Sequence, residues 1–311
     1  QMAVTGVLAV GMLFVIVARQ IDLSIGSIVG LAGGVAAMSQ GFGLLASLGI
    51  AIVIGVVVGA LQGTLVAYAS IPSFIVTLGG LLTWRGVILY LSKGETIPVR
   101  LPLFRLLGVA LVTPASGIAL AVIAIAVVIW LYRRHLLRAV VLSVLIAGFI
   151  WMMNSQGGVP LPVLVLIAVA LLGHFLTQHT VFGRYLYAIG SNPEAARLSG
   201  INNRLYILGA FALLGALVGV ASLLHTARVG SASPDAGTLM ELDAIAACVI
   251  GGTSLMGGRG KVAGALLGAL VMASLDNGMS LLSVESATQY IIKGAVLVAA
   301  VGFDMAGRRK S

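Results

Sequence analysis

Apolar segments follow one another along this chain with only short polar breaks between them. They run for about 15 to 26 residues, close to the length that an α-helix needs to cross the hydrocarbon part of a membrane. Of the 311 residues, 60% are hydrophobic and only 9% are charged, whereas soluble domains carry roughly a quarter charged residues. Helices satisfy every backbone hydrogen bond inside lipid. The sequence therefore predicts an all-α, polytopic membrane protein, with residues 1–311 in one transmembrane domain.

The apolar pattern also predicts how often the chain crosses the membrane. We expect about eleven spans, at residues 4–18, 24–39, 44–69, 74–91, 113–131, 139–153, 160–176, 205–226, 242–255, 262–282 and 289–303. The one long polar and basic stretch between spans is 180–204. Counting spans away from this loop in both directions assigns every other loop to a side of the membrane.

The basic residues divide unequally between the two sides. Of the 18 Lys and Arg residues, twelve share the side of the 180–204 loop: Arg19, Arg133, Arg134, Arg138, Arg184, Arg197, Arg204, Arg259, Lys261, Arg308, Arg309 and Lys310. The other side holds Lys93, Arg100, Arg105 and Arg228, while Arg85 and Lys293 fall within spans. Because loops rich in Lys and Arg stay in the cytoplasm, the 180–204 loop is predicted to be cytoplasmic. The net charge of +9 therefore reflects membrane topology and does not indicate nucleic-acid binding.

The number of predicted spans also indicates where the two ends of the sequence lie. It places Gln1 outside the membrane, and the chain begins in the middle of an apolar pattern without an initiator Met. We therefore expect a preceding span and a cytoplasmic tail to be missing from this sequence. The turn at 132–138 is short enough that a further loop is expected there too.

Within the cytoplasmic loop, the run SNPEAARLSG has the signals of a short, complete helix. Asn192 suits the N-cap, Pro193 the first helical position, Glu194 the positive end of the helix dipole, and Gly200 a left-handed stop. With Leu198 and Arg197 also exposed, this helix is predicted to dock on a soluble partner. The alternative is a solvated loop that is capped by chance.

Glycines recur at every fourth position in two places. Gly26, Gly30 and Gly34 follow the segment IDLS, and Gly260, Gly264 and Gly268 follow SLMGGR at a constant offset of 234 residues. Such a face lets another helix approach closely, and the offset suggests two pseudo-repeated halves. The same spacing at Gly55, Gly59 and Gly63, and a total of 41 glycines, leave general close packing as an alternative.

Catalytic and cofactor signals are weak. The run GGRGK at 257–261 superficially resembles a phosphate-binding loop, but Leu255 and Val262 stand where that motif needs Gly and Ser or Thr. The four histidines are scattered, and the single Cys248 lies in a small-residue run. We expect no catalytic residue, no cofactor and no metal site.

Charge inside the spans is also scarce. Of the acidic residues, Asp22 and Asp243 fall near segment ends, and only Asp276, followed by Asn277, lies clearly within a span. The pair either lines a polar pathway or joins helices by hydrogen bonds. Since gradient-driven carriers usually place functional charges deep in their spans, this chain is predicted to depend on a partner for energy.

Four runs carry a family resemblance: AVGMLFVIVARQIDLSIGS at 9–27, PSFIVTLGGLLTWRG at 72–86, GRYLYAIGSNPEAARLSGIN at 183–202 and ELDAIAACVIGGTSLMGGRG at 241–260. Together they resemble the permease subunits of bacterial sugar importers of the ATP-binding-cassette class, and the likeness extends from residue 1 to 303. SLDNGMSLL at 274–282 and an extra hairpin at about 113–153 make the chain most similar to D-xylose permeases. Other members carry ribose, arabinose or galactose, and these sugars remain alternatives, as does a gradient-driven carrier.

The resemblance implies partners and a role for each marked segment. It implies a homodimer in the bacterial cytoplasmic membrane, two cytoplasmic ATPase subunits, and a periplasmic sugar-binding protein that meets the loops at 92–112 and 228–240. The loop 177–204 would hold the helix that couples to the ATPase. Lipid surrounds the subunit, which itself performs no covalent chemistry. The residues expected to line or pack the pathway are Asp22, Ser24, Gly26, Gly30, Gly251, Gly252, Gly264, Asp276 and Asn277.

Overall fold

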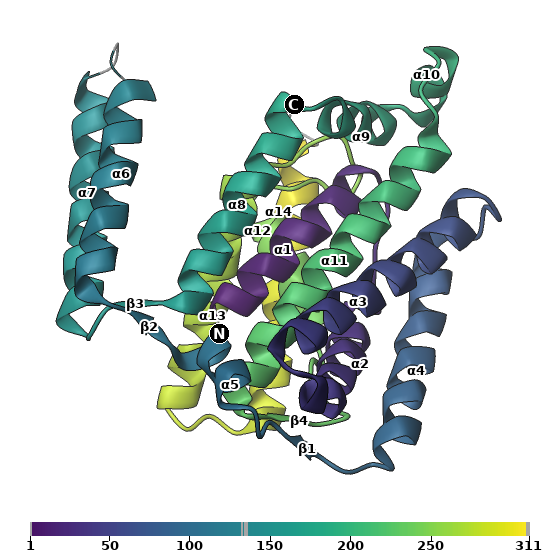
Figure 1. The fold of residues 1–311 in the computed structure, drawn as a ribbon. Helices are drawn as coiled ribbons and strands as arrows, with labels where there is room; N and C mark the ends of the chain where they lie inside the picture. The colour runs from purple at the N-terminus through teal and green to yellow at the C-terminus, as the bar shows by residue number, and fades with distance from the viewer. Residues whose placement is uncertain (1, 132, 134–135, 309–311) are drawn as a thin grey trace.

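Helix α1 (Met2–Val17) lies at the centre of the protein. The computed structural model describes residues 2–131, 133 and 136–308, and within it nearly every side chain of α1 is buried. Helices α8 (Leu161–His179), α11 (Asn203–Val229), α12 (Met240–Ile250) and α13 (Val262–Leu281) pack around α1. A helix that is apolar on all sides needs apolar surroundings, either lipid or other helices, and here other helices cover α1, which carries no charged residue. The core of the protein is therefore built around its first helix (Figure 1).

The remaining elements surround this core. They are α2 (Ile25–Met38), the 3-10 helix η1 (Ser39–Phe42), α3 (Leu44–Ala67), α4 (Ser73–Ser92), α5 (Pro102–Val109), α6 (Pro114–Leu131), α7 (Leu136–Ser155), α9 (Val181–Ser191), α10 (Pro193–Leu198) and α14 (Ser286–Arg308). The four described strands have two residues each: β1 (Ile97–Pro98), β2 (Leu111–Val112), β3 (Val159–Pro160) and β4 (Ser231–Ala232). The antiparallel pairs are β1 with β4 and β2 with β3.

Seven helical segments in the described part of the chain are long and apolar enough to cross a membrane: Ile25–Phe42, Leu44–Ala67, Ser73–Ser92, Leu136–Ser155, Leu161–His179, Asn203–Val229 and Val262–Leu281. Their number and the predominance of helix confirm an all-α, polytopic membrane protein. Three further apolar helices are shorter: Met2–Val17, Pro114–Ala126 and Ser286–Gly302. The count of about eleven spans stays a prediction.

The predicted span at 242–255 needs a correction. Its helix, α12, ends at Ile250, because Gly251 follows and Gly252 has a φ of +82°, in the left-handed region that favours glycine. Eleven helical residues reach only about 17 Å, roughly half of the hydrocarbon thickness. Helix α12 therefore enters the bundle without crossing it. The chain then continues without regular structure to α13.

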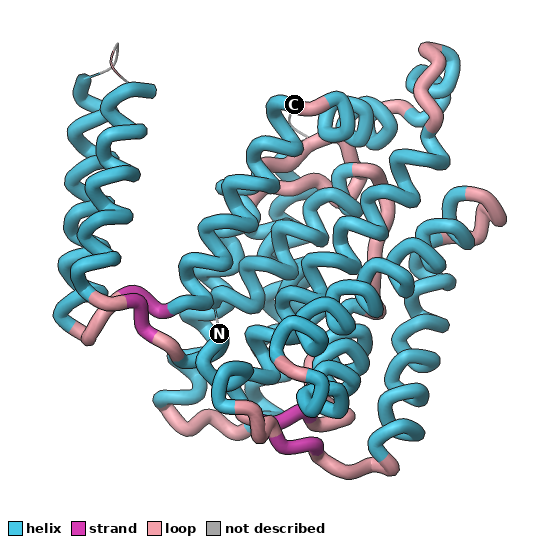
Figure 2. Tube along the Cα trace, viewed as in Figure 1, coloured by secondary structure: helices cyan, strands magenta, loops and turns pink. Residues whose placement is uncertain are grey.

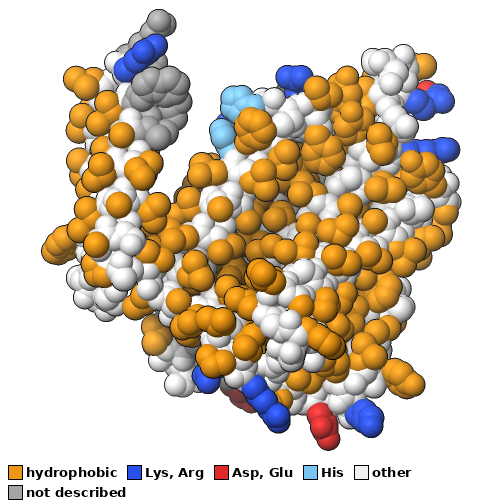
Figure 3. Space-filling view, in the orientation of Figure 1, with side chains coloured by type: hydrophobic (Ala, Val, Ile, Leu, Met, Phe, Trp, Pro, Cys, Tyr) orange, Lys and Arg blue, Asp and Glu red, His pale blue; other side chains and the backbone are white. Residues whose placement is uncertain are grey.

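The two ends of the bundle differ in character. Helices α9 and α10 lie at one end, and α5 and the strands lie toward the other, as Figure 2 shows. On the face drawn in Figure 3, charged side chains gather at both ends and apolar side chains cover the band between them. This distribution is the one expected for a protein whose middle is surrounded by lipid.

Helices α6 and α7 form an antiparallel hairpin that stands to one side of the bundle (Figure 1). They pack on each other, and the β2–β3 pair joins the hairpin to the rest of the protein. Apolar side chains such as Trp151 and Leu137 are exposed on it. The helices lie where the sequence predicts an extra hairpin at 113–153. The further loop expected at 132–138 falls largely outside the described residues.

Helices α3 and α11 show what the glycine spacing does. Along α3, a Cβ atom at Gly55 or Gly59 would collide with backbone atoms of Gly215 and Phe211 on α11. In the sequence, this run is only a further example of a common spacing. In the fold it is a close contact in which both helices contribute small residues.

Candidate functional site

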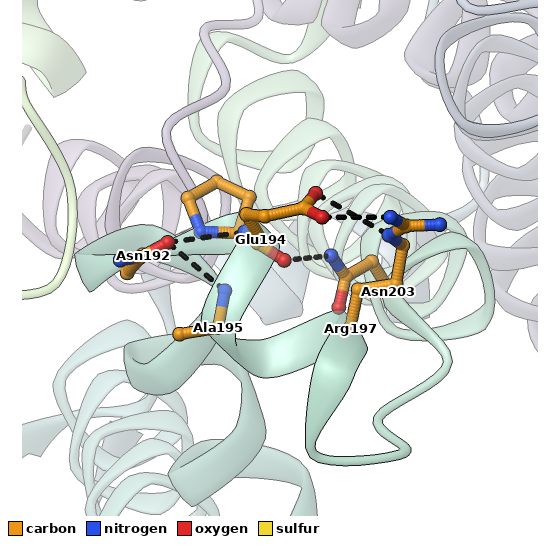
Figure 4. A network of polar contacts seen from close by, with 6 residues as sticks. Asn192, Glu194, Ala195, Arg197 and Asn203 are labelled. Atoms are coloured by element: carbon orange, nitrogen blue, oxygen red, sulfur yellow. Dashed lines mark hydrogen bonds and ion pairs between the residues drawn. The ribbon is translucent and has the colours of Figure 1, made fainter.

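Helix α10 has the cap that the sequence predicts (Figure 4). The Asn192 side-chain oxygen accepts hydrogen bonds from the backbone N–H groups of Glu194, at 3.1 Å, and Ala195, at 3.0 Å. Pro193 is the first helical residue, and Gly200 has a φ of +82° just beyond the C-cap. Asn192 accepts from backbone N–H groups that have no partner within the helix, and Pro193 has no N–H group to satisfy. Gly200 takes the left-handed conformation that commonly ends a helix. The predicted helix is therefore confirmed.

Every described residue of α10 except Ala196 is exposed. Arg197 Nη2 donates to Glu194 Oε1 at 2.7 Å, and both side chains are about two-thirds exposed. The hydrogen bond and the charge of Arg197 lower the pKa of the Glu194 carboxyl group. Leu198 is 76% exposed beside them. A large apolar side chain next to an exposed ion pair is suited to a protein contact.

The other side of this segment is tied to the bundle. Asn203 at the start of α11 donates from Nδ2 to the Pro193 carbonyl oxygen at 2.8 Å. In α9, the Tyr187 hydroxyl group donates to the Gly260 carbonyl oxygen at 2.8 Å. Gly258 N–H in turn donates to the carbonyl oxygen of Val17, near the end of α1, at 2.9 Å. The α9–α10 segment is thus linked to the irregular stretch between α12 and α13.

A second polar group lies where the chain is irregular between α1 and α2. The Asp22 carboxylate accepts hydrogen bonds from the Ser24 backbone N–H at 2.7 Å and from the Ser24 hydroxyl group at 2.6 Å. Gln62 of α3 reaches across and donates from Nε2 to Ser24 Oγ at 2.8 Å. All three side chains are almost completely buried. The sequence assigns Asp22 and Ser24 to the pathway but gives no sign of Gln62.

Both glycine faces have members that lie against α12 or the chain next to it. A Cβ at Gly30 of α2 would lie 2.9 Å from the Ala236 carbonyl oxygen, and one at Gly26 would collide with Gly237 and the Glu241 carboxylate. On α13, Gly264 lies in the same way against the carbonyl oxygen of Gly251. Packing therefore explains Gly26, Gly30, Gly251 and Gly264. Gly252 differs, because its left-handed φ ends α12.

Helices α12, α13 and α14 are joined by a buried ionic triad, which we define as Asp243, Asp276 and Lys293. Lys293 Nζ lies 3.0 Å from Asp243 Oδ2 and 2.9 Å from Asp276 Oδ1. The side chains are 10 to 18% exposed. Asp243 Oδ1 has no hydrogen-bond partner in the described chain. Since each carboxylate depends on the same ammonium group, the triad holds three helices together.

Sequence reasoning missed this triad. It places Lys293 in a span and Asp243 near a segment end, and it treats Asp276 with its neighbour Asn277 as the polar pair. The structure instead directs Asp276 toward Lys293 and leaves Asn277 exposed on α13. The available signal was that three charged residues fall in or beside the last three apolar segments, where an unpaired charge is costly.

The predicted site residues therefore form separate groups. Residues 192–200 lie at one end of the bundle, Asp22 and Ser24 lie between α1 and α2, and Asp276 lies beside α14. Among the residues that the structure describes, no three His, Cys, Asp or Glu side chains are placed to hold a metal ion. The arrangement offers hydrogen bonds and buried ion pairs between helices.

Comparison with known proteins gives a consistent result. Residues 1–301 match the family described as branched-chain amino acid transport system / permease component. The chain is 45% identical to the xylose transport system permease protein of Escherichia coli strain K12, over 100% of this chain and 84% of that protein. It is 44% identical to the Haemophilus influenzae protein of the same name, over 100% of this chain and 88% of that protein.

The ribose import permease protein of Escherichia coli strain K12 is also similar, with 37% identity over 98% of this chain and 83% of that protein. No solved structure matches the chain significantly.

Proposed function

The chain belongs to the family of permease components of transport systems, and from this membership we propose that it is the membrane subunit of an ATP-driven sugar importer. It carries a monosaccharide, foremost D-xylose, inward across the bacterial cytoplasmic membrane. The observation that carries the proposal is the 45% identity to a xylose permease over the whole chain. Identity to a ribose permease is lower, at 37%. Ribose, arabinose and galactose are the alternative cargoes.

In this proposal the energy comes from cytoplasmic ATPase subunits. Helix α10 is the docking element, because it is exposed, capped within its own sequence and carries Leu198 at its surface. Movement of α10 would reach the membrane part through α9, whose Tyr187 holds Gly260 beside the break after α12. The subunit itself provides the pathway and performs no hydrolysis.

Delivery of the sugar is assigned to a periplasmic binding protein on the other side. The two loops expected to meet it, 92–112 and 228–240, are joined by the β1–β4 pair, in which Ile97 lies opposite Ala232. A partner that contacts one loop would therefore also displace the other. Two copies of the permease complete the assembly.

A gradient-driven carrier is the competing function, and the buried ionic triad is the observation that favours it. Ion-driven carriers keep charged groups in their spans for proton or ion coupling. Here, however, Lys293 contacts both carboxylates, so the triad also has a structural explanation. The two functions make opposite predictions for the isolated chain.

Reconstitution separates them. We expect xylose uptake into liposomes only when the permease, ATPase subunits, binding protein and ATP are all present. Uptake by the permease alone, driven by a sodium or proton gradient, would mean that the protein is a gradient-driven carrier and not an ATP-driven importer. Uptake of ribose in preference to xylose, with the matching binding protein, would keep the importer and change its cargo.

The docking assignment is tested by Arg197→Glu and Leu198→Asp. Each places a negative charge on the exposed surface of α10, so we expect the ATPase to bind at least about tenfold more weakly while the permease stays folded. Arg133→Glu is the matched control, because the charge count places Arg133 on the same side of the membrane, outside α10. If both α10 variants copurify with the ATPase as well as the wild-type protein does, α10 is not the docking surface.

A further inference from the structure

Asp22 presents an unusual combination of burial and charge. Its side chain is only 1% exposed, at the irregular stretch that separates α1 from α2. No Lys, Arg or His nitrogen of the described chain lies within ion-pair distance of its carboxylate. Within the described chain, the hydrogen bonds that this carboxylate accepts all come from Ser24. A carboxylate without a cation inside a membrane protein marks a functional site, because burial without compensation is costly.

Two further polar side chains lie around the same place. Gln62 is 2% exposed and donates from Nε2 to Ser24 Oγ at 2.8 Å, and its Oε1 lies 3.1 Å from the same hydroxyl oxygen. The indole Nε1 of Trp84, on α4, is buried and has no hydrogen-bond partner in the described chain. An indole N–H can only donate, and leaving it unpaired costs about 1–3 kcal/mol. The cluster therefore has a free donor.

Gly80 lets these groups pack closely around one point of α4. A Cβ at this position would lie 3.1 Å from Trp84 Nε1 and 3.3 Å from Ser24 Cβ, and it would collide with Gln62 Nε2. The amide, the serine and the indole thus surround one point on α4. Any side chain larger than that of glycine would displace the Gln62 amide group.

The chemistry of the cluster suits a molecule with several hydroxyl groups. The carboxylate accepts hydrogen bonds, the indole donates, and the amide and serine hydroxyl groups do both. A polyol needs such a mixture when it leaves water. Because Asp22, Ser24 and Gln62 are held by hydrogen bonds to one another, they can exchange these partners for a sugar and release it again.

We propose that Asp22, Ser24, Gln62 and Trp84 form a transient binding site for sugar hydroxyl groups at the break between α1 and α2. The inference rests on the proposed importer function and names the residues that the cargo meets. The sugar reaches them when α1 and α2 separate from α4. The Trp84 N–H then donates to a hydroxyl oxygen of the sugar.

The test compares Trp84→Phe with Trp151→Phe in the reconstituted importer. The first change removes the N–H group and keeps an aromatic ring, and the second makes the same change on the exposed α7 surface. Uptake of xylose and of each singly deoxygenated xylose is measured with saturated binding protein. We expect Trp84→Phe to slow xylose uptake about three- to tenfold, corresponding to one lost hydrogen bond. It should not slow uptake of the one analogue that lacks the partner hydroxyl group.

Equal slowing of xylose and of every analogue would overturn the site and leave Trp84 a packing residue. Unchanged uptake would overturn it as well. Uptake that depends on sodium but is indifferent to Trp84→Phe would assign Asp22 to a cation instead. If Trp84→Phe reduces assembly with the ATPase, uptake of xylose and of the deoxygenated analogues is measured with Ser24→Ala instead. A loss that is absent for one analogue would support the binding site, and equal loss for all of them would overturn it.

Failure of this inference differs from failure of the proposed function. If wild-type protein assembles with its partners but moves no sugar with ATP, the importer function is wrong. If wild-type protein moves xylose and the variants show no analogue dependence, only the binding site is wrong.

Discussion

Helices α10 and α12 are both short, and both carry acidic residues in the first turn, yet they are stabilised in different ways. Helix α10 has six residues, is capped by Asn192 and pairs Glu194 with Arg197 in water. Helix α12 has eleven residues and no side-chain cap, and it pairs Asp243 with Lys293 from another helix. The first helix depends on neighbours in sequence, and the second depends on neighbours in space.

This difference has energetic consequences. Exposed ion pairs contribute little, because water and salt screen them and because two long side chains must be ordered. A buried ion pair contributes modestly as a whole, but removal of one partner leaves an uncompensated charge. Substitutions in the buried ionic triad should therefore affect folding, and substitutions in α10 should affect a partner.

The largest effect is expected for Lys293→Met. It leaves Asp243 and Asp276 buried without a cation, and broken pairs of this kind typically cost about 3–5 kcal/mol. The thermal unfolding midpoint in detergent should fall clearly, and the yield should fall with it. Lys93→Met, at an exposed position, is the control. An unchanged midpoint would mean that the triad contributes as little to stability as the exposed ion pair of α10.

Removing all three charges sharpens this result. Asp243→Asn, Asp276→Asn and Lys293→Met combined should recover much of the lost stability, because no charge remains to be desolvated. If the combined variant is as unstable as Lys293→Met, size and shape at this position matter more than charge.

Packing around α12 gives the next largest effect. In Gly264→Leu the new side chain would collide with the backbone of Gly251, and in Gly30→Leu it would meet the carbonyl oxygen of Ala236. Overpacking typically costs about 1–3 kcal/mol, so we expect lower thermal stability or loss of transport. Gly41→Leu is the control, since no atom lies within 4 Å of a Cβ placed there. If leucine is tolerated equally well at all three positions, close helix packing at Gly30 and Gly264 is not required.

Asp276→Asn distinguishes the two interpretations of this residue. As part of the triad, its loss leaves Lys293 with Asp243, so the thermal midpoint should fall less than in Lys293→Met. As a pathway residue together with Asn277, it should leave assembly normal and slow sugar uptake. Measuring both properties on the same protein separates the roles. Normal sugar uptake in a well-assembled Asp276→Ala variant would exclude a role of Asp276 in the pathway.

A smaller and local effect is expected for Asn192→Ala. Loss of the cap should destabilise α10 by about 1 kcal/mol, and the Ala195 amide should exchange its hydrogen faster. The unfolding midpoint of the whole protein should not change. A fall as large as that of Lys293→Met would show that α10 is not an independent local unit.

The smallest effect concerns the ion pair of α10. Arg197 lowers the pKa of the Glu194 carboxyl group, so the pair persists at neutral pH and is lost only as the pH falls through this lowered pKa. We expect the Glu194 titration, followed by NMR, to move back toward the ordinary range in Arg197→Gln. The global unfolding midpoint should be the same in both proteins. Identical titration curves would mean that the pair does not form in solution.

The sequence by itself determined the membrane class and the capped helix. The signals for α10 lie within residues 192–200, where every cap interaction joins residues a few positions apart. Composition alone required lipid as the solvent, because so much apolar surface cannot be buried otherwise. The pair Gly251–Gly252 already marks where a helix should stop, although the predicted span continued past it.

Only the tertiary structure decided which distant groups meet. Lys293 finds Asp243 and Asp276 on two other helices, and Gln62 of α3 finds Ser24 beside α2. Hydropathy is nearly uniform along these spans, so periodicity does not show which face of a helix is turned inward. The partners are set by how helices pack, and close approach at glycines fixes that packing. Local hydrogen bonds follow from sequence spacing, whereas buried pairs follow from the arrangement of the whole bundle.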